Sequence, residues 1–347
     1  MSKVDKSLAV KYRPKVFEDL IEQDYIKAIL LNQLNTNTTK QAYLFCGPAG
    51  DGKTTSARIF ANEINNGKGK PIEIDAASNN GVDDVRQIIE DSKRKPLDSE
   101  YKVFIIDEVH MLSTGAWNAM LKLLEEPPKT AIFIMCTTDP QKIPATILSR
   151  VQRYDFRKIS TQGIFNRLKY ICDTENGIRN RKDKITYEED ALYYIANYAK
   201  GGMRNAITML DKCISLNTNV TVNSILDVLG NVDYTVNFNF LNSIINKDFK
   251  SAISIVDNIY NGGKDLKQFF KEFQTILIDI INVKLFETFR GTTLPTSEDI
   301  KNNIDNLSFN DCADVLDLII DINNNLKWES DVITYVKSYL LVNVRLE

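Results

Sequence analysis

Short apolar runs alternate with longer helical stretches over the first half of the chain. The runs are rich in β-branched and aromatic residues and occupy residues 42–46, 71–74, 102–106, 131–136 and 153–156. Such alternation is typical of a parallel sheet whose strands are joined by crossover helices. We therefore predict an α/β fold for residues 1–158, with these five runs as its strands.

Beyond Thr161 the strand pattern ends, and apolar residues recur with helical spacing, first at Ile164, Leu168 and Ile171. We expect one helical domain over residues 159–230 and a second over 231–347, punctuated by turn-forming residues at 217–223 and 230–233. The clearest helix of the last region carries one apolar stripe, formed by Leu266, Phe269, Phe270, Phe273 and Leu277. Such a stripe is a core face more often than a subunit contact.

The composition is that of an ordinary globular protein, with 43% hydrophobic and 26% charged residues in a chain of 347. No apolar run approaches the roughly 20 residues needed to cross a bilayer, and the first six residues lack the apolar segment of a signal peptide. We therefore expect a cytoplasmic protein. The net charge of -3 argues against a uniformly basic nucleic-acid coat, so any DNA contact must come from a local group of Lys and Arg.

The cysteines are scattered along the chain, their number is odd, and none forms a C-x-x-C pair suited to zinc. We expect all five to be reduced core residues: Cys46, Cys136, Cys172, Cys213 and Cys312.

A glycine-rich loop links the first apolar run to a helix-like stretch at residues 54–61. Glycine allows successive amide groups to point at one anion, and the start of the following helix adds its positive dipole end. Lys53 would reach the β- and γ-phosphates of a nucleotide, and Thr54 would place its hydroxyl on Mg2+. The alternative is a glycine turn with a stray lysine, which the order of strand, loop and helix disfavours. The predicted nucleotide contacts here are Gly47, Pro48, Ala49, Gly50, Asp51, Gly52, Lys53, Thr54 and Thr55.

The apolar run at 102–106 is followed by two acids, Asp107 and Glu108. In this arrangement the first carboxylate joins the Mg2+ shell, directly or through water, and the second acts as the base beside an attacking water. Thr138 follows the next apolar strand, so its hydroxyl can bind the γ-phosphate or that water. The alternative is a pair of acids that merely cap a strand at the surface.

Several further motifs occur in a fixed order, and together with the glycine loop they resemble the bacterial clamp-loader ATPases, the gamma/tau subunits of DNA polymerase III. The motifs lie at residues 11–14, 75–78, 107–112, 124–128, 137–144, 147–150 and 201–206. The resemblance is dense from residue 9 to about residue 212 and weaker through the last domain. It implies an AAA+ P-loop NTPase sheet with a helical lid, followed by an all-α collar that holds several subunits in a ring, pentameric in this family.

The resemblance also implies an activity and its residues. The subunit would hydrolyse ATP to open a sliding clamp and place it on primer-template DNA during replication, without itself polymerising. Arg150 would act in trans as an arginine finger in a neighbouring subunit's site, and Arg204 on the lid would touch the γ-phosphate. The adenine would be enclosed by Tyr12, Arg13 and Ile21.

The sequence departs from the family pattern at several places. Residues 65–70 close the gap where the family inserts a four-cysteine module, so no zinc is expected. Asn79 and Asn80 occupy positions that typically contact DNA with basic side chains, and Arg86 could compensate for the lost charge. The basic run at 93–95 is another candidate DNA contact, although the interpretation we favour for it is a solvated loop. Asp51 places an acid in a loop for a polyanion, so ATP affinity should fall if its side chain points inward.

Two other functions compete with the loader. One is an ATP-binding scaffold subunit that does not hydrolyse nucleotide, and Lys53, Glu108 and Arg150 argue against it. The other is a related AAA+ machine that remodels DNA or protein, such as a branch-migration motor or a replication initiator. His110, the single histidine, is expected to orient its neighbours rather than to bind metal, because one imidazole cannot form a metal site.

Overall fold

The computed structural model describes residues 6–180, 183–229, 234–289 and 298–343, together with Thr292 and Leu294. The chain forms two compact units: unit 1 comprises Met1–Arg167 and Ala199–Thr208, and unit 2 comprises Leu168–Tyr198 and Met209–Glu347. The predicted boundary at residues 230 and 231 lies outside the described residues. The division into three domains, with its other boundary at residue 158, therefore stays a prediction.

Unit 1 contains a parallel five-stranded sheet with the order β2-β3-β4-β1-β5. The strands are β1 (Ala42–Cys46), β2 (Ile72–Asp75), β3 (Lys102–Asp107), β4 (Ala131–Thr137) and β5 (Gln152–Asp155). These positions confirm the five predicted runs to within one residue at each end. Strands β1 and β4 are buried along their whole length, as expected for central parallel strands covered on both faces.

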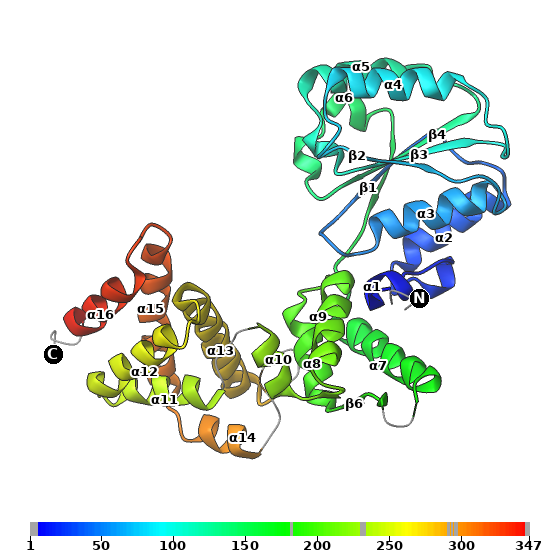
Figure 1. The fold of residues 1–347 in the computed structure, drawn as a ribbon. Coiled ribbons are helices and arrows are strands. Elements are labelled where there is room, and N and C mark those ends of the chain that lie inside the picture. Colours follow the sequence, from blue (N-terminus) through cyan, green and yellow to red (C-terminus); the bar gives the residue numbers. More distant parts are fainter. Residues whose placement is uncertain are drawn as a thin grey trace. The chain divides into compact units, whose positions relative to one another are not determined.

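Helices cover both faces of this sheet (Figure 1): α2 (Asp24–Asn35) and α3 (Lys53–Ile64) lie on one face, and α4 (Val82–Lys93), α5 (Thr114–Glu125) and α6 (Ala145–Leu148) lie on the other. Alternate strand residues enter two separate cores, because successive side chains point to opposite faces. Tyr43 and Phe45 belong to the core under α3, whereas Leu44 and Cys46 belong to the core under α5. The shorter elements of unit 1 are α1 (Leu8–Lys11), η1 (Phe17–Asp19), η2 (Val109–Met111) and η3 (Pro140–Lys142).

Two helices, α7 (Thr161–Ile178) and α9 (Met203–Leu216), begin in unit 1 and continue into unit 2. Unit 2 adds α8 (Glu189–Tyr198), α10 (Val222–Leu229), α11 (Tyr234–Ile245), α12 (Phe249–Asn261), α13 (Leu266–Phe286), α14 (Glu298–Asp305), α15 (Phe309–Leu326) and α16 (Val332–Asn343). The sequence shows no strand pattern beyond Thr161, but the structure contains a short parallel pair there, β6 (Thr186–Tyr187) and β7 (Asn219–Val220). Strands of two residues are too short to produce a period-two pattern in the sequence.

Helix α13 carries the core of unit 2. The predicted apolar stripe is confirmed as a core face, because all five of its residues are buried. Phe240 of α11 packs against it with ring centroids 5.6 Å from Phe269 and 5.1 Å from Phe273. Across the described part of the chain, no helix is long and apolar enough to span a bilayer.

Candidate nucleotide-binding site

A cavity of about 440 Å³ opens at the carboxyl end of the unit 1 sheet. Ligands of open parallel sheets commonly bind at this edge, where connections leave the strands in opposite directions. Most of the predicted site residues lie here, although they are far apart in the sequence. The predicted residues that line the cavity are Tyr12, Arg13, Ile21, Ala49, Gly50, Asp51, Gly52, Lys53, Thr54, Thr55, Asp107, Glu108, Thr138 and Arg204.

The glycine-rich loop connects β1 to α3 and brings the 201–204 segment against the cavity. Gly50 and Gly52 have φ values of 80° and 104°, a region that side chains with a Cβ rarely adopt. A Cβ on Gly50 would lie 3.1 Å from the Cα of Gly202, so the two backbones approach closely. Met203 donates its N–H to the Gly50 carbonyl over 3.0 Å. This contact explains how Arg204, remote in sequence, reaches the wall of the cavity.

Lys53 and Asp51 form a buried ion pair inside the loop, with side-chain exposures of 5% and 1%. The Lys53 Nζ atom donates to Asp51 Oδ1 over 3.0 Å, to the Gly47 carbonyl over 2.7 Å and to the Pro48 carbonyl over 2.5 Å. Burial raises the pKa of Asp51, and the neighbouring Lys53 ammonium partly offsets that effect. The side chain of Asp51 therefore points inward, which is the orientation for which we expect a lower ATP affinity.

Thr54 and Asp107 provide oxygen atoms suited to a magnesium ion. The Thr54 hydroxyl donates to Asp107 Oδ2 over 2.8 Å. Thr54 belongs to the first turn of α3, and Asp107 ends β3, so both lie at the same edge of the sheet. Hydroxyl and carboxylate oxygens are ligands that Mg2+ prefers in proteins, and the ion usually retains several waters. The residues present therefore fit the predicted metal.

Glu108 lies beside this pair and is held by a group of polar side chains. Its Oε2 atom accepts the Thr138 hydroxyl over 2.9 Å and the Thr138 N–H over 3.3 Å. His110 Nδ1 lies 3.3 Å from the same oxygen and 3.1 Å from the Thr137 hydroxyl. Glu108 has a φ of 49°, a left-handed conformation that is uncommon for glutamate. The Glu108 carboxylate is therefore held in place by its neighbours.

Residues that the sequence prediction missed complete the cavity, among them Arg58, Arg167 and Met203. Arg58 lies four residues after Thr54 on α3, and this helical spacing could have indicated it. Its guanidinium binds Glu73 over 2.7 and 2.5 Å. Arg167 donates to the Tyr12 carbonyl over 3.0 Å. No local signal in the sequence connects those two residues, because they are 155 positions apart.

Arg150 lies outside this cavity. Its guanidinium donates to Glu125 Oε1 over 2.8 Å and to the Thr146 carbonyl over 2.7 Å, and 34% of its side chain is exposed. Gly47 and Pro48 do not line the cavity either, but their carbonyls accept hydrogen bonds from Lys53.

The residues predicted to contact DNA are all exposed on unit 1. Asn79 donates to the Asp75 carbonyl over 3.0 Å, and Arg86 pairs with Asp83 over 2.8 Å. Asn80 accepts an N–H from Ser113 through its backbone carbonyl. Arg86 also lines a groove of about 560 Å³ between α4 and α5, together with Lys93, Lys122 and Glu126.

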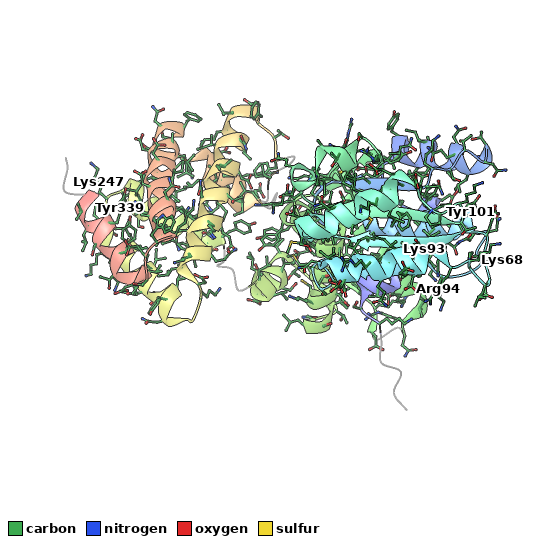
Figure 2. All side chains as sticks on the ribbon, turned by 90° about the horizontal axis from the view of Figure 1, so that it is seen from above. Lys68, Lys93, Arg94, Tyr101, Lys247 and Tyr339 are labelled. Atoms are coloured by element: carbon green, nitrogen blue, oxygen red, sulfur yellow. The ribbon has the colours of Figure 1, made fainter. Side chains whose placement is uncertain are left out.

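The basic run at 93–95 is partly paired. Lys93 binds Glu90 over 2.6 Å, and Arg94 lies 3.7 Å from Asp91. Figure 2 shows Lys68 at the outer edge of unit 1. These ion pairs are solvent-exposed, as expected for a solvated segment, but Lys93 is the last residue of α4 and does not belong to a loop.

Three protein-family models match parts of the chain. The model of the DNA polymerase III delta subunit matches residues 67–160. The model of the DNA polymerase III clamp loader subunit ATPase lid domain matches residues 164–219. The model of domain III of the DNA polymerase III gamma and tau subunits matches residues 220–319.

Proteins with similar sequences are named as subunits of DNA polymerase III. DNA polymerase III subunit tau of Bacillus subtilis is 36% identical over 341 residues, which cover 91% of this chain and 59% of that protein. DNA polymerase III subunit gamma of Buchnera aphidicola is 35% identical over 301 residues, which cover 80% of this chain and 81% of that protein. The matched part spans only 51% of the Mycoplasma genitalium gamma/tau subunit, so this chain corresponds to about half of several relatives.

Among solved structures, the RuvB Holliday junction branch migration motor of Thermotoga maritima has a similar fold. It matches 67% of this chain and 79% of its own chain with a TM-score of 0.51. The two sequences are 20% identical over the match, so this similarity supports the fold alone.

Proposed function

The chain belongs to the gamma/tau family of DNA polymerase III clamp-loader subunits, and we propose that it is an ATP-hydrolysing subunit of such a loader. The observation that carries the proposal is one cavity that combines three parts of a phosphoryl-transfer site. These are the Lys53 loop, the Thr54–Asp107 oxygen pair and the Glu108–Thr138 pair. Each part corresponds to one requirement of nucleotide hydrolysis: phosphate binding, metal binding and orientation of water.

The proposed mechanism assigns each requirement to named groups. Mg2+, held by Thr54 and Asp107, would neutralise the developing charge on the phosphate oxygens. Lys53 would exchange some of its three present partners, the Gly47 and Pro48 carbonyls and the Asp51 carboxylate, for the β- and γ-phosphates. Glu108 would accept a hydrogen bond from the attacking water and take its proton, while Thr138 fixes the carboxylate.

The adenine and the lid contacts extend the same proposal. Tyr12, Arg13 and Ile21 line the same cavity and would enclose the adenine. Arg204 would bind the γ-phosphate and link the position of α9 to the nucleotide state. The three-domain division is part of this proposal, and it is supported by the separate family models that match the lid at residues 164–219 and domain III at residues 220–319.

Arg150 would act on a neighbouring subunit, because it lies outside the cavity of its own chain. An arginine supplied in trans can raise a hydrolysis rate about a thousandfold or more. A mixing experiment tests this part. Lys53→Ala and Arg150→Ala chains, each inactive alone, should recover hydrolysis when mixed if the sites are shared. Failure of the mixture to recover activity, with assembly intact, would remove the shared-site assignment.

The proposal extends to partners: like or related subunits in a ring of five, a sliding clamp and primer-template DNA, all in the cytoplasm. Arg86 and the polar side chains of Asn79 and Asn80 would contact the DNA backbone. A non-hydrolysing scaffold subunit is the main competing function, since its cavity would also bind ATP. A DNA-remodelling motor is the other, but the RuvB similarity supports only a shared fold.

A measurement of ATP hydrolysis distinguishes the hydrolysing loader subunit from the non-hydrolysing scaffold subunit. Wild-type protein should bind ATP and release phosphate only with Mg2+, Lys53→Ala should lose binding, and Glu108→Gln should bind ATP without turnover. ATP binding without phosphate release by the assembled wild-type protein would favour the scaffold function.

A further inference from the structure

Asp51 is the most unusual group in the glycine-rich loop. It is a carboxylate with 1% exposure, situated in a loop that would bind a polyanion. Its Oδ1 atom accepts the Lys53 backbone N–H over 3.2 Å and the Lys53 ammonium over 3.0 Å. Its Oδ2 atom is buried and has no hydrogen-bond partner. Burying an ionised carboxylate is costly unless it is paired, so Lys53 is the group that makes this position tolerable.

The Lys53 ammonium has three N–H donors, and all three have partners inside the loop. Asp51 takes one, and the carbonyls of Gly47 and Pro48 take the other two. A nucleotide whose β- and γ-phosphates require Lys53 must therefore replace some of these bonds. If Lys53 stops donating to a neutral carbonyl, the cost in free energy is modest. If it stops donating to Asp51, a buried carboxylate is left without its counter-ion.

The close packing around Asp51 restricts other ways to satisfy the carboxylate. A Cβ on Gly47 would lie only 2.2 Å from Asp51 Oδ2, which shows how tightly this oxygen packs against the start of the loop. Asp51 also lines the cavity in which the nucleotide would bind. It therefore stays near any bound phosphate chain, and like charges at close range in a buried site repel strongly.

We infer that Asp51 is an affinity-determining residue that competes with the nucleotide for Lys53 and so weakens the binding of polyphosphates. This inference rests on the proposed ATP site. It goes beyond that site because it assigns to one side chain, Asp51, a reduced affinity of the chain for nucleotide polyphosphates. Removal of the charge should raise affinity for ligands whose phosphates reach Lys53. It should not raise affinity for AMP, which lacks the β- and γ-phosphates.

The test compares Asp51→Asn and Asp51→Thr with wild-type protein by calorimetric titration of ATP and of AMP. We expect each variant to bind ATP about tenfold or more tightly, the scale of one interaction with a charged group, with AMP affinity unchanged. Two variants are used because Asn keeps the shape of the carboxylate while Thr is smaller. Asp19→Asn, an exposed acid in η1, is the matched control and should leave both affinities unchanged.

A general loosening of the loop would weaken ATP binding, so a gain limited to ATP separates competition from structural damage. Equal ATP affinity in wild-type protein and both variants would overturn the inference and leave the proposed ATP site intact. Equal gains for ATP and AMP would also overturn it. Failure of wild-type protein and variants alike to bind ATP would overturn the inference together with the proposed function.

Discussion

Thr138→Val should separate nucleotide binding from hydrolysis. Valine has nearly the shape of threonine but cannot donate the hydrogen bond that Glu108 Oε2 accepts over 2.9 Å. The Thr138 backbone N–H still points at the same oxygen over 3.3 Å, and His110 Nδ1 remains 3.3 Å away. Glu108 should therefore stay in place but become less well oriented toward a water.

The magnitude follows from the lost bond. A hydrogen bond to a charged group contributes about 1.5–3 kcal/mol. If that contribution is lost in the transition state, the rate should fall about 10- to 150-fold. Lys53 and the loop are unchanged, so ATP affinity should alter by less than about threefold.

The assay is single-turnover hydrolysis at saturating ATP, with affinity measured separately by titration. Thr130→Val is the control, since Thr130 precedes β4 at the end of that strand opposite to Thr138. Its turnover should equal that of wild-type protein. An undiminished rate in Thr138→Val, or a loss explained entirely by weaker ATP binding, would refute the assigned role of the hydroxyl.

Three further predictions concern stability and thiol chemistry. Phe273→Ala should destabilise unit 2 by about 3–5 kcal/mol in denaturant melts, because the side chain is fully buried against other aromatic rings. Asn65→Ala should cost about 2–3 kcal/mol, since its amide exchanges two hydrogen bonds with the Tyr101 backbone, both 2.9 Å; exposed Asn62→Ala should cost far less. Burial raises the pKa of Cys46 to about 11 and of Cys172 to about 12 from an ordinary value of 9.0, so the fold keeps both thiols neutral. Their contribution to stability should be complete below pH 9 and decline as the pH rises through 11 and 12, and a thiol reagent should label both only after unfolding.

Much of unit 1 could be predicted from the sequence because its signals are local. Each central strand is a continuous apolar run, and the glycine loop and acid pair follow directly after two of them. Parallel strands place their carboxyl ends at one edge, so the position of Lys53 near Asp107 and Glu108 follows from topology. The buried state of all five cysteines was likewise predicted and is confirmed.

The features that could not be predicted depend on contacts between residues that are distant in the sequence or on how a loop packs. The contact of Arg167 with Tyr12 joins distant segments, and the inward orientation of Asp51 depends on how the loop folds around Lys53. The pair β6 and β7 was missed because its backbone hydrogen bonds require little from the side chains.

Steady-state ATP hydrolysis, measured with and without primer-template DNA and a cognate clamp, tests the central proposal most directly. Lys53→Ala and Arg150→Ala versions should be measured beside wild-type protein, assembled with its partner subunits. The proposal predicts strong stimulation by clamp and DNA together, abolished by either substitution. Hydrolysis indifferent to both ligands would contradict the loader function and favour a scaffold or remodelling role.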